Sequence, residues 1–297
     1  MYKGRFAPSP SGPLHLGSIS TAIASYLDAK SNQGLWLLRI DDIDSTRTTS
    51  HFTKMILKQL DDLHLHWDEA IQYQSKRLEH YRHYLDSLNE IKCTYICNCS
   101  RKKISEQGEL GVDGYIYPGT CRLKSNLMQR NNSIRIITLD EMITFEDKVQ
   151  GSVQQNILKH CGDFIINRSD EIFAYQFCVV IDDYLDKITN VIRGSDLLES
   201  TPRQIYIHKK LKFDIPDYGH IPVLNFKNKK LSKGNGDRLD IDNDAQKIWL
   251  TCLKILNQRM PNKDLSLKEI IQHAIEYWDI KKLKKIKSID VDEHIQT

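Results

Sequence analysis

The chain has 297 residues, of which 40% are hydrophobic and 27% are charged, and its formal net charge is +3. This length and apolar content suffice for one large or two modest domains with a buried core, and the charge is too small to indicate nucleic-acid binding by itself. The sequence contains neither a secretory signal nor the roughly 20 apolar residues of a membrane span, so we expect a cytoplasmic protein without membrane contact.

The beginning of the chain predicts a strand, a loop, a helix and a second strand. Residues 2–6 form a short strand, and the proline- and glycine-rich residues 7–13 form a loop. Apolar residues then recur at helical spacing: Ile19, Ala22, Ile23, Tyr26 and Leu27. Gly34 is expected to end this helix as its C-cap residue, and the apolar residues 35–40 form a buried strand. This order predicts a βαβ unit with a parallel sheet.

Further elements follow in chain order. We predict helices at 51–63 and 76–90, a strand at 134–138, a helix at 173–183, a strand at 189–193, a helix that starts at Thr201-Pro202 with Thr201 as its cap, a strand at 218–224, and mainly helices from residue 244. The middle of the chain is rich in Cys, Gly and Asn, which indicates an inserted subdomain. The predicted divisions are 1–93, the first half of an α/β catalytic domain; 94–167, the insertion; 168–228, the second half; and 229–297, a lysine loop with a helical C-terminal segment.

The loop before the first helix is a candidate phosphate site. It leads through His15, Gly17 and Ser18 into the helix, whose start offers free N–H groups and a partial positive charge. His15 could donate to a phosphate oxygen, and Gly17 would let a flat base approach the backbone. The alternative is an ordinary Gly-Pro loop before a helix.

A second candidate phosphate site lies downstream, where Lys230 and Lys233 flank Leu231-Ser232 in a loop that contains glycine. Two lysines at this spacing can neutralise a triphosphate and the charge that develops during phosphorus chemistry. For a lysine pair alone, the alternative is a solvated surface loop.

Together the two segments resemble the signature motifs of class I aminoacyl-tRNA synthetases, His15-Leu16-Gly17-Ser18 for the first and Lys230-Leu231-Ser232-Lys233 for the second. The string from Gly4 to Gly12 is similar to the start of the glutamyl branch, and the resemblance extends to about Gly234. It runs through Arg39-Ile40-Asp41-Asp42-Ile43-Asp44, Gln74-Ser75, Phe173-Ala174-Tyr175, Ile192 to Leu198 and Pro216-Asp217-Tyr218. The resemblance implies a class I Rossmann-type parallel sheet with a zinc-containing α+β insertion.

Two features favour the short family that glutamylates queuosine in tRNA(Asp). The chain ends soon after the lysine loop, and about sixty residues cannot form the large anticodon-binding domain of full-length glutamyl-tRNA synthetases. Ser18 also closes the first motif as it does in the short enzymes. The implied reaction uses ATP with Mg²⁺ to form glutamyl-adenylate, and the implied acceptor is a hydroxyl of the queuosine base in the anticodon loop.

The resemblance also implies the glutamate-binding residues. Arg5 matches the position that holds a carboxylate, which a guanidinium can grip through two parallel hydrogen bonds. Asp41 departs from the family's Glu at the position that receives the ammonium group, so the charge is kept but its reach is shorter by one methylene. The remaining expected contacts are Phe6, Ala7, Pro8, Ser9, Tyr175 and Arg193. Without the resemblance, these residues would be read as surface or core positions, and Asp41 as part of a polar turn.

A metal site is expected in the insertion. Cys97-Asn98-Cys99 is followed by Cys121, and three thiols at this spacing suit tetrahedral zinc, although Cys-x-Cys alone fits buried core thiols equally well. The resemblance implies that Tyr117, and not Tyr115, completes a structural zinc site in the insertion that faces the tRNA. The other four of the seven cysteines, Cys93, Cys161, Cys178 and Cys252, are expected to be isolated and buried.

We therefore predict an enzyme that acts as a monomer, with His15, Lys230 and Lys233 stabilising the charge that develops on the α-phosphate. Three alternatives remain open: a truncated enzyme that charges the 3′ end of tRNA(Glu), a non-catalytic paralogue that binds RNA or an amino acid, and a nucleotidylyltransferase. A lysine cluster near the C-terminus is either an RNA contact or a solvated helix face. It comprises Lys281, Lys282, Lys284, Lys285 and Lys287.

Overall fold

A computed structural model describes residues 1–112, 114–124, 132–226, 229–230, 244–262, 264–283 and 285–291, with the backbone alone at 226 and 229–230. None of the helices in this described part is long and apolar enough to cross a membrane.

The predicted βαβ unit is confirmed. β1 (Lys3–Phe6) leads into α1 (Leu16–Ser31), and β2 (Leu35–Ile40) pairs with β1 in parallel, with Arg5 opposite Leu37. The helix ends differently from the prediction: Asn32 is the C-cap, and Gln33 takes the left-handed conformation with φ of 52°. Gly34 is needed for space instead, because a Cβ there would lie 2.5 Å from the carbonyl oxygen of Tyr2.

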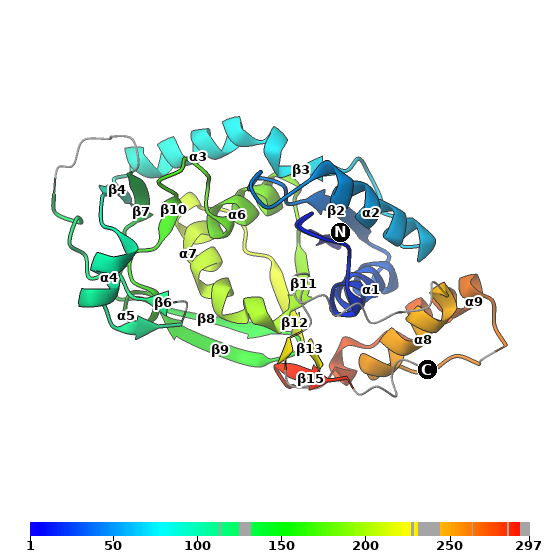
Figure 1. The fold of residues 1–297 in the computed structure, drawn as a ribbon. Helices are drawn as coiled ribbons and strands as arrows, with labels where there is room; N and C mark the ends of the chain where they lie inside the picture. Colours follow the sequence, from blue (N-terminus) through cyan, green and yellow to red (C-terminus); the bar gives the residue numbers. More distant parts are fainter. Residues whose placement is uncertain are drawn as a thin grey trace.

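The sheet is completed by strands from distant parts of the chain (Figure 1). β3 (Gln72–Tyr73) adds to β2 in parallel. β11 (Asn190–Gly194) lies beside β1, where Thr189 N donates to the Lys3 carbonyl at 2.9 Å. β12 (Asp217–Ile221) pairs with β11 in parallel, and the hairpin of β8 (Met142–Asp147) and β9 (Gly151–Asn156) joins β12 through β8. The strands that carry the predicted site residues therefore lie side by side.

Two hydrophobic clusters cover the two faces of this sheet, because side chains alternate along each strand. In β2, Leu38 joins the cluster that contains α1, and Leu37 joins the other one. The first cluster is closed by α8 (Ala245–Ile255) and α9 (Leu267–Glu276), which pack against α1. The second contains α3 (Leu78–Glu90), α6 (Tyr175–Leu185) and α7 (Thr201–Leu211).

The insertion lies at the end of the molecule away from α8 and α9 (Figure 1). β7 (Ser133–Ile136) pairs in antiparallel fashion with β4 (Thr94–Cys97) and with β10 (Ile165–Asn167). Its smaller elements are α4 (Arg101–Gln107), β5 (Leu110–Gly111), β6 (Gly114–Tyr115) and α5 (Ile157–Cys161). The domain limits given above stay a prediction.

Among the remaining elements, the helix confirms the prediction at 51–63, whereas the 3₁₀ turns and the last two strands were not predicted. The remaining elements are α2 (Ser50–Asp62), the 3₁₀ turns η1 (Gln74–Lys76), η2 (Ser195–Ser200) and η3 (Ile280–Lys282), and the strands β13 (Val223–Phe226), β14 (Lys229–Lys230) and β15 (Ser288–Asp290). The single strand predicted at 218–224 is interrupted at Pro222, which separates β12 from β13. Thr201 is the first residue of α7 and not its cap, which is Ser200.

Candidate active site

The first motif lies at the start of α1, where His15 is the N-cap. Its Nδ1 accepts a hydrogen bond from Ser18 N at 3.3 Å, and its Nε2 lies 3.1 Å from Ser18 Oγ. The loop is tied to α2 through Gln59, which bonds both the N–H and the carbonyl of Leu14 at 2.8 and 3.1 Å. The imidazole thus sits at the helix start, the place where a phosphate would gain most from free N–H groups.

The strand β13, which precedes the second motif, lies against Gly17 of the first motif. A Cβ on Gly17 would lie 3.8 Å from Leu224 Cβ in β13, and 3.2 Å from the His15 ring. β13 pairs with β14, in which Lys230 lies opposite Asn225. The structure therefore places the backbone of Lys230 opposite Asn225, the neighbour of the Leu224 that faces Gly17, whereas Lys233 lies outside the described residues.

Three strands each direct an arginine to the face covered by α6. Arg5 in β1 donates to both oxygens of Asp183 on α6, from Nε at 3.1 Å and Nη2 at 3.2 Å. Arg39 in β2 donates to the same carboxylate at 2.7 Å. Burial alone would raise the pKa of Asp183, but Arg5 and Arg39 outweigh it and lower this pKa to about 2. Asp183 therefore stays ionised and holds Arg5 in one orientation.

Asp41 lies at the end of β2, next to this cluster. Its carboxylate accepts from Arg39 Nε at 2.7 Å, and its N–H donates to the Pro8 carbonyl at 3.1 Å. Burial raises the pKa of Asp41 to about 6, although Arg39 and Arg5 oppose the rise. The carboxylate is thus mainly ionised at neutral pH, buried and within the influence of Arg5.

Arg193, in β11, is 4% exposed and projects to the same face of the sheet. It donates from Nε to His220 Nε2 at 2.9 Å and from Nη2 to Thr201 Oγ1 at 2.8 Å. Its Nη1 is buried and has no hydrogen-bond partner among the described residues. A buried guanidinium nitrogen without an acceptor is unfavourable, and a substrate carboxylate would satisfy it.

Tyr218 in β12 lies beside Arg193. Burial raises its pKa; the positive charges of Arg193 and Arg5 oppose the rise, and Asp183 and Tyr175 add to it. The Arg193 guanidinium lies 5.4 Å from the centre of the Tyr218 ring. Arg193 in β11 is thus packed beside Tyr218, while Arg5 in β1 is bound by α6, the helix that Tyr175 begins.

The other expected contacts differ in what they present. Phe6 packs in the core with its ring stacked on Trp36 at 6.3 Å, so only its backbone faces the loop. Pro8 is buried, Ala7 is half-buried and Ser9 is exposed. Tyr175 is the first residue of α6 and is 38% exposed, which leaves its ring accessible to a ligand.

The predicted cysteine cluster is assembled in the insertion. The sulfur atoms of Cys97, Cys99 and Cys121 lie within 4.8 Å of one another. The Tyr117 hydroxyl lies 3.4 Å from Cys97 Sγ and 3.5 Å from Cys99 Sγ. Tyr115, in contrast, is 52% exposed in β6. Three thiols and one phenol at these distances form a donor set that fits a zinc ion.

The phenol of Tyr117 would need a bound metal ion to lose its proton near neutral pH. Burial raises the pKa of its phenol, and hydrogen bonds to the three cysteines raise it further. The Arg135 guanidinium lies over its ring at 3.9 Å. A cation bound by the thiolates would lower this pKa and allow coordination by the phenolate. Outside the cluster, Cys178 and Cys252 are buried as expected, but Cys93 and Cys161 are only half-buried.

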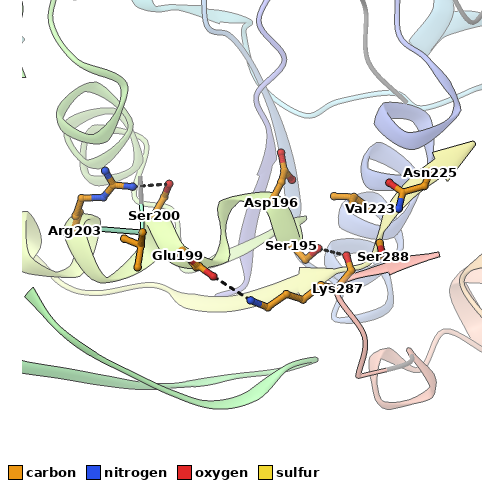
Figure 2. A pocket seen from close by; sticks show the side chains of 10 residues that line it. Ser195, Asp196, Glu199, Ser200, Arg203, Val223, Asn225, Lys287 and Ser288 are labelled. Carbon is orange, nitrogen blue, oxygen red and sulfur yellow. Dashed lines mark hydrogen bonds and ion pairs between the residues drawn. The ribbon is translucent and has the colours of Figure 1, made fainter. Parts of the chain in front are cut away.

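A pocket of about 380 Å³ lies along η2, directly after Gly194 (Figure 2). Glu199 and Lys287 pair across its wall at 3.0 Å. Its lining is Val112, Ser195, Asp196, Glu199, Ser200, Arg203, Val223, Asn225, Lys287 and Ser288. The pocket is therefore bounded by Val112 of the insertion, by η2 after the strand that carries Arg193, and by β13 and the C-terminal residues Lys287 and Ser288.

Sequence reasoning missed the residues that hold the arginines in place. Asp183 has a local signal, because two adjacent aspartates in the apolar helix α6 are unusual and indicate buried partners. His220 and Asp147 have none, since their significance depends on pairing between distant strands. The Thr201 hydroxyl also bonds Arg193, a role that its position at a helix start conceals.

Comparison with known proteins agrees with this geometry. Residues 2–249 match the family model of the catalytic domain of class I tRNA synthetases for E and Q. The glutamyl-Q tRNA(Asp) synthetase of Photorhabdus laumondii is 41% identical over 98% of this chain and 91% of its own length. That of Serratia proteamaculans is 38% identical over 99% and 95%.

Solved structures show the same fold. A glutamate tRNA ligase from Elizabethkingia meningosepticum, crystallised with its amino acid, superposes with a TM-score of 0.81 at 24% identity, over 99% of this chain and 68% of its own. On these grounds the chain belongs to the catalytic-domain family of class I tRNA synthetases for E and Q, and within it to the glutamyl-Q tRNA(Asp) synthetases.

Proposed function

We propose that this protein activates L-glutamate with ATP and transfers the glutamyl group to the queuosine base in the anticodon loop of tRNA(Asp). The observation that carries the proposal is a set of groups on one face of the sheet. Arg5 is held by Asp183 on α6, the helix that Tyr175 begins, Asp41 is held by Arg39, and Arg193 presents a buried Nη1 without an acceptor among the described residues. Two cations, one anion and a hydroxyl are the complement of an amino acid with a second carboxylate. The names of the full-length relatives support glutamate and the tRNA(Asp) acceptor.

In the first step, the α-carboxylate of glutamate attacks the α-phosphate of ATP and releases pyrophosphate; Mg²⁺ bound with ATP would supply positive charge for this step. Arg5 and Arg193 bind carboxylate oxygens, and Asp41 receives the ammonium group. The other substrate contacts come from Tyr175 and from the loop Phe6, Ala7, Pro8 and Ser9. His15, Gly17 and Ser18 hold the nucleotide at the start of α1, and Lys230 and Lys233 complete the phosphate site. No side chain acts as a nucleophile, so positioning and electrostatic stabilisation supply the catalysis.

In the second step, a hydroxyl of the acceptor base attacks the mixed anhydride, and AMP leaves. We place the acceptor nucleotide at the pocket along η2, because it adjoins Arg193 and is lined by Val112 of the insertion. Cys97, Cys99, Cys121 and Tyr117 hold a structural zinc ion that stabilises this insertion. A bulky residue at the exposed Ser288, Ser288→Trp, should fill the pocket and reduce transfer to tRNA, with pyrophosphate exchange unchanged.

Two assays with the full chain test the function. Glutamate-dependent exchange of pyrophosphate into ATP, measured without tRNA, reports activation, and its absence would point to a non-catalytic paralogue. Transfer of labelled glutamate to total tRNA is then compared between tRNA that contains queuosine and tRNA from cells unable to make it. We expect labelling of the first sample alone; equal labelling of both would indicate an enzyme that charges the 3′ end of tRNA(Glu).

A further inference from the structure

A chain of three buried side chains crosses three neighbouring strands and ends at Arg193. Asp147 is the last residue of β8, His220 lies in β12, and Arg193 lies in β11 opposite His220. His220 Nδ1 lies 2.5 Å from Asp147 Oδ2, and its Nε2 lies 2.9 Å from Arg193 Nε. The side chains of Asp147 and His220 are fully buried, so water does not compete for these bonds.

The surroundings of Asp147 determine the tautomer of His220. Asp147 Oδ1 accepts from the backbone N–H groups of Val149, Gln150 and His220 at 3.0, 2.8 and 3.0 Å. The other oxygen is left to accept from His220 Nδ1, which must therefore carry the proton. Nε2 then carries a lone pair, as required to accept a hydrogen bond from Arg193 Nε. Burial lowers the pKa of His220 to about 4, in agreement with a neutral ring.

The consequence for Arg193 is a fixed orientation. Nε is held by His220 and Nη2 by Thr201, and the buried Nη1 is left without an acceptor among the described residues. A neutral acceptor at Nε holds the guanidinium without cancelling its charge. Arg5 differs, because the carboxylate of Asp183 binds it directly.

We propose that Asp147 and His220 are positioning residues, which hold Arg193 so that Nη1 meets a carboxylate of glutamate. This inference rests on the proposed function, since it assigns a role within the same substrate site. Because Asp147 bonds His220 and His220 bonds Arg193, both residues act through Arg193, so their loss should affect the KM for glutamate and leave the KM for ATP unchanged.

Two substitutions of His220 separate positioning from stability. In His220→Asn, the amide occupies the place of Nδ1, so it keeps the bond to Asp147 but cannot reach Arg193. In His220→Gln, the amide oxygen reaches the place of Nε2 and can accept from Arg193, but Asp147 loses its partner. If His220 only stabilises the fold, His220→Gln, which loses the bond to Asp147, should be the less stable variant and should bind glutamate more weakly. If His220 positions Arg193, His220→Asn should bind glutamate more weakly than His220→Gln.

A third substitution acts through the tautomer. In Asp147→Asn, the oxygen keeps the three backbone bonds, and the new NH₂ group faces His220 Nδ1. This nitrogen must then accept, the proton moves to Nε2, and Nε2–H opposes Arg193 Nε–H. His208→Gln is the control, because His208 is also buried and has a pKa lowered by burial to about 4, but it makes no described bond to Arg193.

The experiment measures glutamate-dependent pyrophosphate exchange, glutamate binding by calorimetry without ATP, and melting temperature on the full chain. We expect the KM and Kd for glutamate to rise about tenfold or more in His220→Asn and Asp147→Asn, the weakening typical of a lost charge-assisted bond. His220→Gln should stay within about threefold of wild type despite a lower melting temperature. Equal KM values in His220→Asn and His220→Gln, or KM values that follow melting temperature, would overturn the inference.

The controls keep the two proposals distinguishable. Wild-type protein that binds glutamate but does not exchange pyrophosphate would refute activation and leave the positioning test intact. Protein that binds no glutamate at all would refute both proposals.

Discussion

The Asp183 carboxylate is the common acceptor of two buried arginines, and its removal offers a quantitative test of the site. Arg5 donates to it at 3.1 and 3.2 Å and Arg39 at 2.7 Å. All three side chains are at most 5% exposed. Asp183→Asn keeps the shape of the side chain but removes its charge, and it turns an NH₂ group toward guanidinium donors.

The size of the effect follows from these contacts. Breaking a buried ion pair by removing one partner costs about 3–5 kcal/mol. Arg5 and Arg39 lower the pKa of Asp183 to about 2, which corresponds to roughly 2 kcal/mol of stabilisation of the ionised folded state. Loss of the hydrogen bonds that Arg5 and Arg39 donate to Asp183 adds to the roughly 2 kcal/mol that follows from the pKa. We therefore expect a loss of about 3–5 kcal/mol in unfolding free energy and a melting temperature lower by about 5–15 °C.

Urea and thermal unfolding, followed by circular dichroism at pH 7.5, measure this loss. The matched control is Asp217→Asn, because the Asp217 side chain is 69% exposed and lies 3.6 Å from Lys148. An exposed pair of this kind contributes at most about 1 kcal/mol. Asp183→Asn should also raise the KM for glutamate, since Arg5 loses the carboxylate that orients it.

The pH dependence of the loss has a definite sign. A folded-state pKa below the usual value means that the stabilisation is complete above about pH 4 and declines as the pH falls toward 2. The stability difference between wild type and Asp183→Asn should therefore narrow in acid. A variant within about 1 kcal/mol of wild type at pH 7.5 would refute the argument that Asp183 balances Arg5 and Arg39.

Three further predictions concern the ammonium site, Arg193 and the metal. Because burial raises the pKa of Asp41 to about 6, the KM for glutamate should rise about tenfold between pH 7 and pH 5 as this carboxylate takes up a proton; an Asp41→Asn variant with the same pH profile would contradict this. Arg193→Lys should raise the KM for glutamate by at least about tenfold, because an ammonium group cannot bond His220, Thr201 and a carboxylate in the guanidinium geometry; kinetics like those of wild type would argue against a direct contact. The purified chain should carry about one zinc ion by mass spectrometry, and Cys121→Ser should lose this ion and have a lower melting temperature. Cys252→Ser, which changes a buried thiol outside the cluster, should retain the ion. Full zinc content in Cys121→Ser would exclude the proposed ligand set.

Local patterns in the sequence were sufficient for several of the main elements. Apolar spacing predicted α1, α2, α3 and β2, since helix and strand periodicity depends on residues within one or two turns. The Cys-x-Cys spacing brings two thiols together through a short loop, but the prediction of a metal site also needed Cys121 and the family resemblance. The two phosphate motifs located the start of α1 and the strand pair that approaches it. These features require no knowledge of distant contacts.

What only the tertiary structure decided is which charged groups meet. Arg5 and Asp183 are 178 residues apart, His220 and Asp147 are 73 apart, and Arg193 and His220 are 27 apart. Their proximity depends on the order and register of parallel strands, which no local pattern encodes. Thr201 reads as a helix cap and Gly34 as a helix end, yet one bonds Arg193 and the other makes room for Tyr2. The residues that we propose to contact substrate were accessible from the sequence, whereas the partners that orient them became identifiable once the sheet was assembled.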